Sequence, residues 1–175
     1  MKNGVRANFG KLALIIALLG KFALTPFFLA ALAAPAWAAF DAEGVALGAA
    51  EREIKKRFPS VYCKALEWAS RAADRRCDDA KGTFAGVEVR ITFYLKKGAL
   101  EAFDVRFDTR DAERIAGFLK SRYGAPAAED RERQLYKLQW EARGERAVLT
   151  ALTDKRRASL LVWRGDFEEE IYKVR

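Results

Sequence analysis

Residues 87–95 alternate strictly between apolar side chains and polar or amphipathic ones. The apolar members are Val87, Val89, Ile91, Phe93 and Leu95. A period of two is typical of a strand with one buried face. The alternation recurs over residues 101–107, and Lys97-Gly98 between the two segments favours a tight turn. The pattern therefore predicts an antiparallel hairpin.

Three more segments near the C-terminal end have the composition of strands. They are residues 135–142, 146–153 and 158–163. Residues 143–145 and 154–157 between them are too few for a crossover, so these strands are predicted to be antiparallel. We also expect a brief edge strand at 45–47, and we interpret residues 127–133 as a charged linker.

Helical spacing of apolar residues predicts a helix over residues 49–58. Ala50, Ile54 and Phe58 follow one another at intervals of four, and Pro59 ends the segment. Acidic residues lie in its first turns and basic residues near its end, which matches the helix dipole.

A second helix is predicted over residues 110–123. Asp108 or Thr109 can cap its start, and Gly124 and Pro126 end it. At the end of the chain, the spacing of three apolar residues predicts a short amphipathic helix or a frayed tail. These three residues are Phe167, Ile171 and Val174.

The first 38 residues have the order of a secretory signal peptide. Basic residues come first, an apolar run follows, and Ala36-Trp37-Ala38 supplies the small residues that precede a cleavage site. Cleavage after Ala38 would leave residues 39–175 as a single domain. An uncleaved anchor is the alternative, but Lys21 near the middle of the apolar run disfavours a membrane span. The expected location is the periplasm or the medium, with the domain soluble after cleavage.

Removal of this segment lowers the net charge of the protein. The whole chain has 32 Lys and Arg against 24 Asp and Glu, a formal net charge of +8. Four of the basic residues lie in the first 38, and these are Lys2, Arg6, Lys11 and Lys21. The remaining domain therefore carries only +4, which is ordinary for a soluble protein. We expect no nucleic-acid partner.

Cys63 and Cys77 are the only cysteines. In an oxidising compartment such a pair predicts a structural disulfide. A metal site would need further soft ligands, and a redox pair usually reads Cys-x-x-Cys. A straight helix from 63 to 76 would rise about 21 Å, whereas bridged Cα atoms lie within about 7 Å. The chain is therefore predicted to turn back near residues 70–75, leaving room for only a short helix.

Together these elements predict an α+β fold. Its expected form is a roughly five-stranded antiparallel sheet with two helices packed on one face and one disulfide loop.

Little in the chain indicates catalysis. It has no histidine, which excludes Ser-His-Asp, Cys-His and His-metal sites. No serine lies in a Gly-x-Ser-x-Gly elbow, and the glycines do not form a phosphate-binding loop. We therefore expect no enzymatic activity, no cofactor and no metal.

Two basic clusters are the candidate binding residues. One lies within the disulfide loop and comprises Arg71, Arg75 and Arg76, with Trp68 beside them. The other is Lys155-Arg156-Arg157, at a hairpin tip. Arginine forks onto phosphate and carboxylate groups, so these clusters favour an anionic envelope surface or an envelope protein as partner. The alternative is that they keep the loops solvated.

Two segments resemble a class of small exported bacterial proteins of unknown function. The first runs from Val45-Ala46-Leu47-Gly48 through Ile54 to Phe58-Pro59, and the second from Ile115 through Tyr123-Gly124 to Pro126. The first is partly similar to outer-membrane assembly lipoproteins of the BamE type, although the lipidated cysteine of those proteins is missing. The resemblance implies an exported, non-catalytic module and no catalytic residues.

Three hypotheses for function follow. The first is a periplasmic non-catalytic binding or envelope-assembly module that uses the uncovered sheet face or the disulfide loop. The second is an inhibitor that presents its disulfide loop to an envelope or foreign enzyme. The third is a small hydrolase that needs no histidine, which requires a deep pocket with two facing carboxylates.

Overall fold

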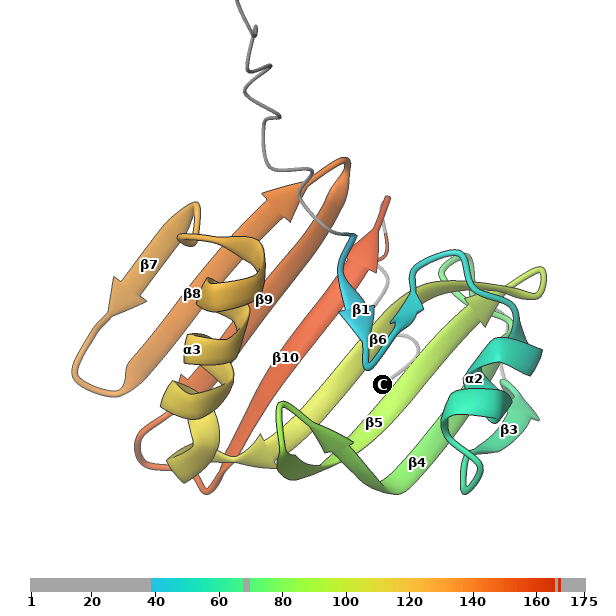
Figure 1. Cartoon of the computed structure of the whole chain (residues 1–175), viewed down its shortest axis with the longest axis horizontal. Coiled ribbons are helices and arrows are strands. Elements are labelled where there is room, and N and C mark those ends of the chain that lie inside the picture. Colours follow the sequence, from blue (N-terminus) through green and yellow to red (C-terminus); the bar gives the residue numbers. More distant parts are fainter. Residues whose placement is uncertain (1–38, 68–69, 166, 168–175) are drawn as a thin grey trace, which may run out of the picture. The chain divides into compact units, whose positions relative to one another are not determined.

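The computed structural model describes residues 39–67, 70–165 and 167, which belong to one compact unit over residues 36–175. Within it, eight antiparallel strands form one sheet in the order β3-β4-β5-β6-β10-β9-β8-β7 (Figure 1). The strands are β3 (Tyr62–Ala65), β4 (Arg75–Phe84), β5 (Val87–Lys96), β6 (Ala99–Asp108), β7 (Ala128–Arg131), β8 (Leu135–Ala142), β9 (Glu145–Leu152) and β10 (Arg157–Arg164).

The strand order divides the sheet into two halves built in the same way. Each half is a helix followed by four strands that pair in sequence, first β3 to β6 and then β7 to β10. The last strand of each half lies at the centre, where Val105 of β6 pairs with Leu160 of β10. The centre of the sheet therefore depends on a contact between residues more than 50 positions apart in the chain.

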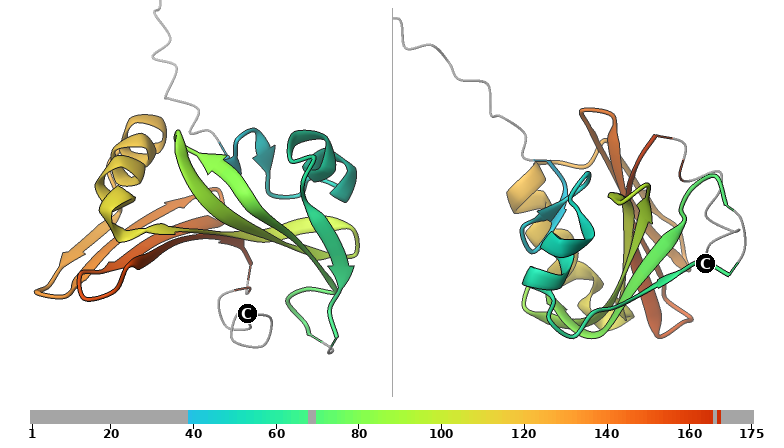
Figure 2. Two further views of the ribbon diagram at one scale, coloured as in Figure 1. Left: turned by 90° about the horizontal axis from the view of Figure 1, so that it is seen from below. Right: turned by 90° about the vertical axis from the view of Figure 1, so that its right-hand side faces the viewer.

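Both helices lie on the same side of the sheet (Figure 2, left). Helix α2 (Glu51–Arg57) precedes β3, and α3 (Ala112–Tyr123) follows a 3₁₀ turn, η1 (Thr109–Asp111), that Asp108 caps through its side chain. Their buried residues, including Ile54 and Ile115, pack against the inward-facing apolar residues of six strands. This layer is the main core.

An N-terminal hairpin completes the same layer. Its two short strands, β1 (Asp41–Ala42) and β2 (Val45–Ala46), lie between the two helices (Figure 1). Phe40, Ala42 and Val45 are buried in the main core. The residues that follow the predicted cleavage site are therefore part of the core.

The opposite face of the sheet carries a second, smaller core. Tyr94, Ala102, Leu161 and Trp163 point away from the helices and are covered by residues of the β3–β4 loop and by Phe167. Phe167 contacts Tyr94, with ring centroids 5.3 Å apart. The helix-free face is therefore covered at one end, whereas the sequence predicted one wholly open face.

The predicted fold class and the predicted disulfide are confirmed, but the predicted number of strands in the sheet was wrong. Eight strands form it instead of five, because β3, β4 and β7 lie where a loop and a linker were expected. Cys63 and Cys77 are paired across β3 and β4 and are bridged. Ala65 pairs with Arg75, so the chain turns back between these two residues, and the described part of this segment contains no helix.

The other predicted elements agree within two or three residues. The expected edge strand at 45–47 is β2, which pairs with β1 and not with the large sheet. Gly48 before α2 has φ +88°, and a Cβ there would lie 3.2 Å from the guanidinium of Arg164. The predicted signal peptide and most of the predicted C-terminal helix lie outside the described residues.

Candidate functional site on the helix-free face

A row of polar residues crosses the open part of the helix-free face. Strand alternation directs the row away from the main core, because its members lie between core residues on every strand. The pairing of β5, β6, β10, β9 and β8 places the members side by side. In order they are Arg90, Arg106, Ser159, Thr150 and Lys137, and we call them the basic row.

Two arginines of the row lie directly opposite each other, Arg90 on β5 and Arg106 on β6. Like charges in this position destabilise a sheet. Arg106 donates through Nε to Asp104 at 2.9 Å, and the Asp104 side chain is fully buried. The side chain of Arg90 forms no hydrogen bond or ion pair with any residue that the structure describes. Its charge therefore remains available to an anionic ligand.

The two arginines line a hollow of about 590 Å³, which we call the basic hollow. Its lining residues are Ala80, Glu88, Val89, Arg90, Arg106, Phe107, Asp108, Arg156 and Arg157. Four arginines and two carboxylates thus surround it. Arg110 lowers the pKa of Asp108 by hydrogen bonds to its carboxylate, so this group is ionised at neutral pH.

The predicted cluster Lys155-Arg156-Arg157 lies at the turn between β9 and β10, beside the basic hollow. Arg156 and Arg157 line the hollow, whereas Lys155 lines a neighbouring one with Thr109 and Arg110. The side chain of Arg156 is 87% exposed and lies 3.8 Å from Asp108. This half of the predicted basic surface therefore joins the site.

The other predicted cluster is divided between the two faces. Arg75 reaches toward the helices and binds Glu51 of α2 at 2.8 Å. Arg76 lies on the helix-free face and binds Asp78 at 2.8 Å. Arg71 is exposed on the β3–β4 loop, and Trp68 lies outside the described residues. These residues do not form one surface.

Hydrogen bonds hold the described part of the β3–β4 loop in place. Leu66 and Asp74 close its base, where the Leu66 N–H donates to the Asp74 carbonyl at 3.0 Å. Lys96 donates to the Ser70 carbonyl at 2.7 Å, and the Lys97 N–H donates to the Asp74 carboxylate at 2.7 Å. These contacts attach the described part of the loop to the sheet at Ser70 and Asp74.

The carboxylate of Glu51 and the two cysteine sulfurs lie within 4.8 Å of one another. Both sulfurs are engaged in the disulfide, so neither is a thiolate ligand. Lys55 and Arg75 hold Glu51 by ion pairs. Hydrogen bonding to Lys55, above all, lowers the pKa of Glu51. This group is a structural ion-pair network.

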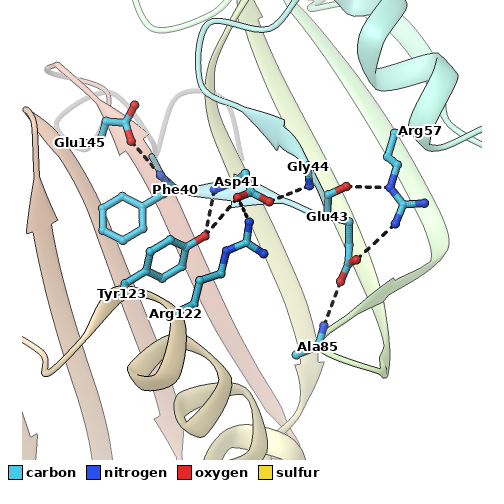
Figure 3. A network of polar contacts seen from close by, with 9 residues as sticks. All are labelled: Phe40, Asp41, Glu43, Gly44, Arg57, Ala85, Arg122, Tyr123 and Glu145. Atoms are coloured by element: carbon cyan, nitrogen blue, oxygen red, sulfur yellow. Dashed lines mark hydrogen bonds and ion pairs between the residues drawn. The ribbon is translucent and has the colours of Figure 1, made fainter. Parts of the chain in front are cut away.

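A second polar network fixes the N-terminal hairpin (Figure 3). Asp41 binds Arg122 and accepts a hydrogen bond from the Gly44 N–H at 2.6 Å. Glu43 binds Arg57 at 3.3 Å, and the main-chain N–H of Ala85 donates to it at 3.2 Å. The hairpin is therefore bound to both helices and to the β4–β5 turn.

Tyr123 completes this network at the end of α3. Its hydroxyl oxygen lies 3.3 Å from the Asp41 N–H and accepts from it, and its ring packs edge-on against Phe40. Burial, followed by the charge of Asp41, raises the pKa of Tyr123 to about 12. These contacts attach the hairpin to the end of α3, which is a structural role.

Arg90 and Arg106 were absent from the residues predicted as a site. Each occupies a polar position of an alternating strand, and such a position is ordinarily just solvated. Their opposition depends on a bulge at the end of the hairpin: pairing shifts by one residue between Tyr94 and Leu95. Simple counting from the turn would place Val105 opposite Arg90.

No helix in the described part of the chain is both long and apolar enough to span a bilayer. No family model matches the chain, and no curated protein or solved structure shows significant similarity to it. The resemblance to exported proteins and BamE-type lipoproteins therefore remains an expectation.

Proposed function

We propose that the protein is an exported, non-catalytic binding module that recognises an anionic envelope ligand through its helix-free face. The observation that carries this proposal is the opposition of Arg90 and Arg106 at the edge of the basic hollow. A sheet gains no stability from two facing guanidinium groups. An anion between them removes the repulsion and gains charge-assisted hydrogen bonds.

The buried carboxylate of Asp104 supports this assignment. It fixes the Nε side of Arg106, whose side chain is still 50% exposed. A guanidinium held on one edge presents its remaining donors in a defined direction, which lowers the entropic cost of binding. Arg156 and Arg157 also line the hollow and add positive charge to it.

The two alternatives gain less support. In the β3–β4 loop, Ala72 and Ala73 are buried in the second core, so this part of the loop is not free to insert into an enzyme. The basic hollow contains Glu88 and Asp108, but the pKa of Asp108 is lowered, which suits an ion-pair partner and not a general acid. Neither feature favours an inhibitor or a hydrolase.

The binding proposal can be tested by NMR titration of the domain from Ala39 onward with inorganic phosphate and galacturonate. We expect saturable shifts of the amides of Arg90, Arg106 and Arg157. The shifts should be lost in Arg90→Glu and retained in Arg52→Glu, a matched control on the exposed side of α2. Equal shifts in both variants, or none with any anion, would refute binding at this face.

The location is tested separately. The full chain is expressed in a Gram-negative host, and the envelope and cytosolic fractions are compared. We expect a periplasmic product whose N-terminal residue is Ala39. A cytosolic product of full length would contradict the export part of the proposal.

A further inference from the structure

The basic row continues beyond the hollow, and its length limits the ligand. Arg106 pairs with Ser159, Ser159 with Thr150, and Thr150 with Lys137. Neighbouring strands lie about 4.8 Å apart. The row therefore runs about 19 Å from Arg90 to Lys137, across five strands.

Its chemistry changes along this length. Cations stand at the two ends, and the hydroxyl groups of Ser159 and Thr150 occupy the middle. Neither hydroxyl forms a hydrogen bond with a residue of the described ranges, and both side chains are partly exposed. Lys137 forms no ion pair within 4.0 Å in the described part of the chain, although Asp130 lies opposite it on β7. The row offers positive charge at its ends and uncommitted hydroxyl groups between them.

Resting on the binding role proposed above, we propose that the ligand is an acidic polysaccharide that lies across the strands along the basic row. Uronic-acid carboxylates would bind the guanidinium groups at one end and Lys137 at the other. Sugar hydroxyls both donate and accept hydrogen bonds, so they match Ser159 and Thr150. One ligand can then satisfy every member of the row.

Two other polyanionic partners fit less well. A polyphosphate has no hydroxyl donors along its length for the central serine and threonine. A lipid bilayer presents phosphates in a plane, whereas the sheet bends so that both its edges turn away from the helices, which makes the helix-free face concave (Figure 2, left). A single chain laid in this concavity reaches the whole row.

The test compares polygalacturonate with galacturonate, polyphosphate and phosphatidylglycerol vesicles, using the domain from Ala39 onward and calorimetry. We expect polygalacturonate to bind at least tenfold more tightly per acidic group than the monomer, and more tightly than polyphosphate or vesicles. Arg90→Ala should weaken both polymer and monomer.

The decisive variant is Lys137→Ala, because Lys137 lies too far from Arg90 for a single sugar to touch both. It should weaken polygalacturonate at least threefold, lower the salt dependence of its binding, and leave galacturonate binding unchanged. Arg52→Ala is the matched control and should change neither.

Failure of the polysaccharide inference is distinguishable from failure of the binding proposal. If Lys137→Ala leaves polymer affinity unchanged, or if polyphosphate or vesicles bind more tightly, the polysaccharide inference is overturned while anion binding at Arg90 stands. If no anion, monomeric or polymeric, binds at all, both are overturned.

Discussion

The guanidinium group of Arg122, at the end of helix α3, binds the carboxylate of Asp41, which lies 81 residues earlier in the chain. Arg57, at the end of α2, donates hydrogen bonds to Glu43 of the same N-terminal hairpin. The acceptors are the main-chain carbonyl and the carboxylate of Glu43. Each half of the fold therefore uses the final turn of its helix to hold one segment (Figure 3). The hairpin links the two halves on the helical side, as β6 and β10 do within the sheet.

Replacement of Arg122 by alanine should destabilise the domain. Asp41 is only 8% exposed, so its carboxylate would lose its cationic partner in a poorly solvated position. Because Arg122 itself is partly exposed, we expect a loss of about 1–2 kcal/mol in the free energy of unfolding, measured by urea denaturation.

Arg52→Ala serves as the control for this variant and should change stability by less than about 0.5 kcal/mol. A double-mutant cycle with Asp41→Asn isolates the pair. Additive losses in that cycle would mean that the two residues are not coupled.

The raised pKa of Tyr123 predicts a loss of stability at high pH. In the unfolded chain tyrosine ionises near pH 10, whereas folded Tyr123 keeps its proton until about pH 12. Between these values the unfolded state binds fewer protons, so the free energy of unfolding falls as the pH rises. Absorbance titration at 295 nm should show an ionisation step near pH 12 that disappears in Tyr123→Phe. A step that persists would assign it to another tyrosine.

The disulfide should contribute about 3 kcal/mol, the chain-entropy value for a loop of about 15 residues. We expect the double variant Cys63→Ala/Cys77→Ala to lose this amount in guanidinium denaturation and the wild type to lose a similar amount on reduction. Thiol labelling of the denatured, unreduced domain should detect no free cysteine. Labelling of two thiols would show that the bridge is not formed.

Local patterns were sufficient to predict five of the eight strands and both helices. The alternation in β5 and β6 and the i+4 spacing of Ile54 and Phe58 follow directly from which side faces the main core. The predicted disulfide also excluded a long helix after Cys63, and this prediction was correct. What it could not indicate was that both cysteines lie on paired strands, because a bridge limits distance and not backbone conformation.

The other strands could not be predicted from local patterns, for physical reasons. All four residues of β7 are exposed, so the strand lacks the alternation that would mark it. In β4, Asp79 is buried and hydrogen-bonded to Ser60, and a bulge follows between Asp79 and Gly82, so the period of two is interrupted. The pairing of β6 with β10 depends on residues far apart in the chain, and local patterns contain no information about it.

The site was predictable only in part. Arg156 and Arg157 stood out as a run of charge at a turn. Arg90 and Arg106 each look like an ordinary solvated residue, and only the bulge near Tyr94 places them opposite each other. The central part of the basic row further requires the β6–β10 contact.

This opposition predicts that binding and stability respond in opposite directions at Arg90. Arg90→Thr removes a repulsion and introduces a residue that favours strands. We expect the free energy of unfolding to stay constant or rise by about 0.2–1 kcal/mol, while anion binding is lost. Thermal unfolding and the phosphate titration check the two effects on the same sample. A clear loss of stability would indicate that Arg90 has a structural role instead.

The predicted mature N-terminus places a new charge beside Glu145. The Phe40 N–H donates to the Glu145 carboxylate at 3.0 Å, and the Phe40 ring is buried. A chain that begins at Ala39 carries its α-ammonium group one residue away from this contact. We therefore expect the ammonium group to be attracted to Glu145 and to strengthen the attachment of the hairpin.

The comparison is between the domain that begins with a free Ala39 and the same domain acetylated at that residue. At pH 6 the free form should be more stable by about 0.2–1 kcal/mol, the range of an exposed ion pair. Pairing with a carboxylate raises the pKa of an amino group, so the difference should vanish as the pH rises through and above about 8. It should also vanish in Glu145→Gln, in which the Phe40 hydrogen bond keeps a neutral acceptor. Equal stabilities of the two forms at pH 6, in the presence of Glu145, would show that the new terminus makes no such contact.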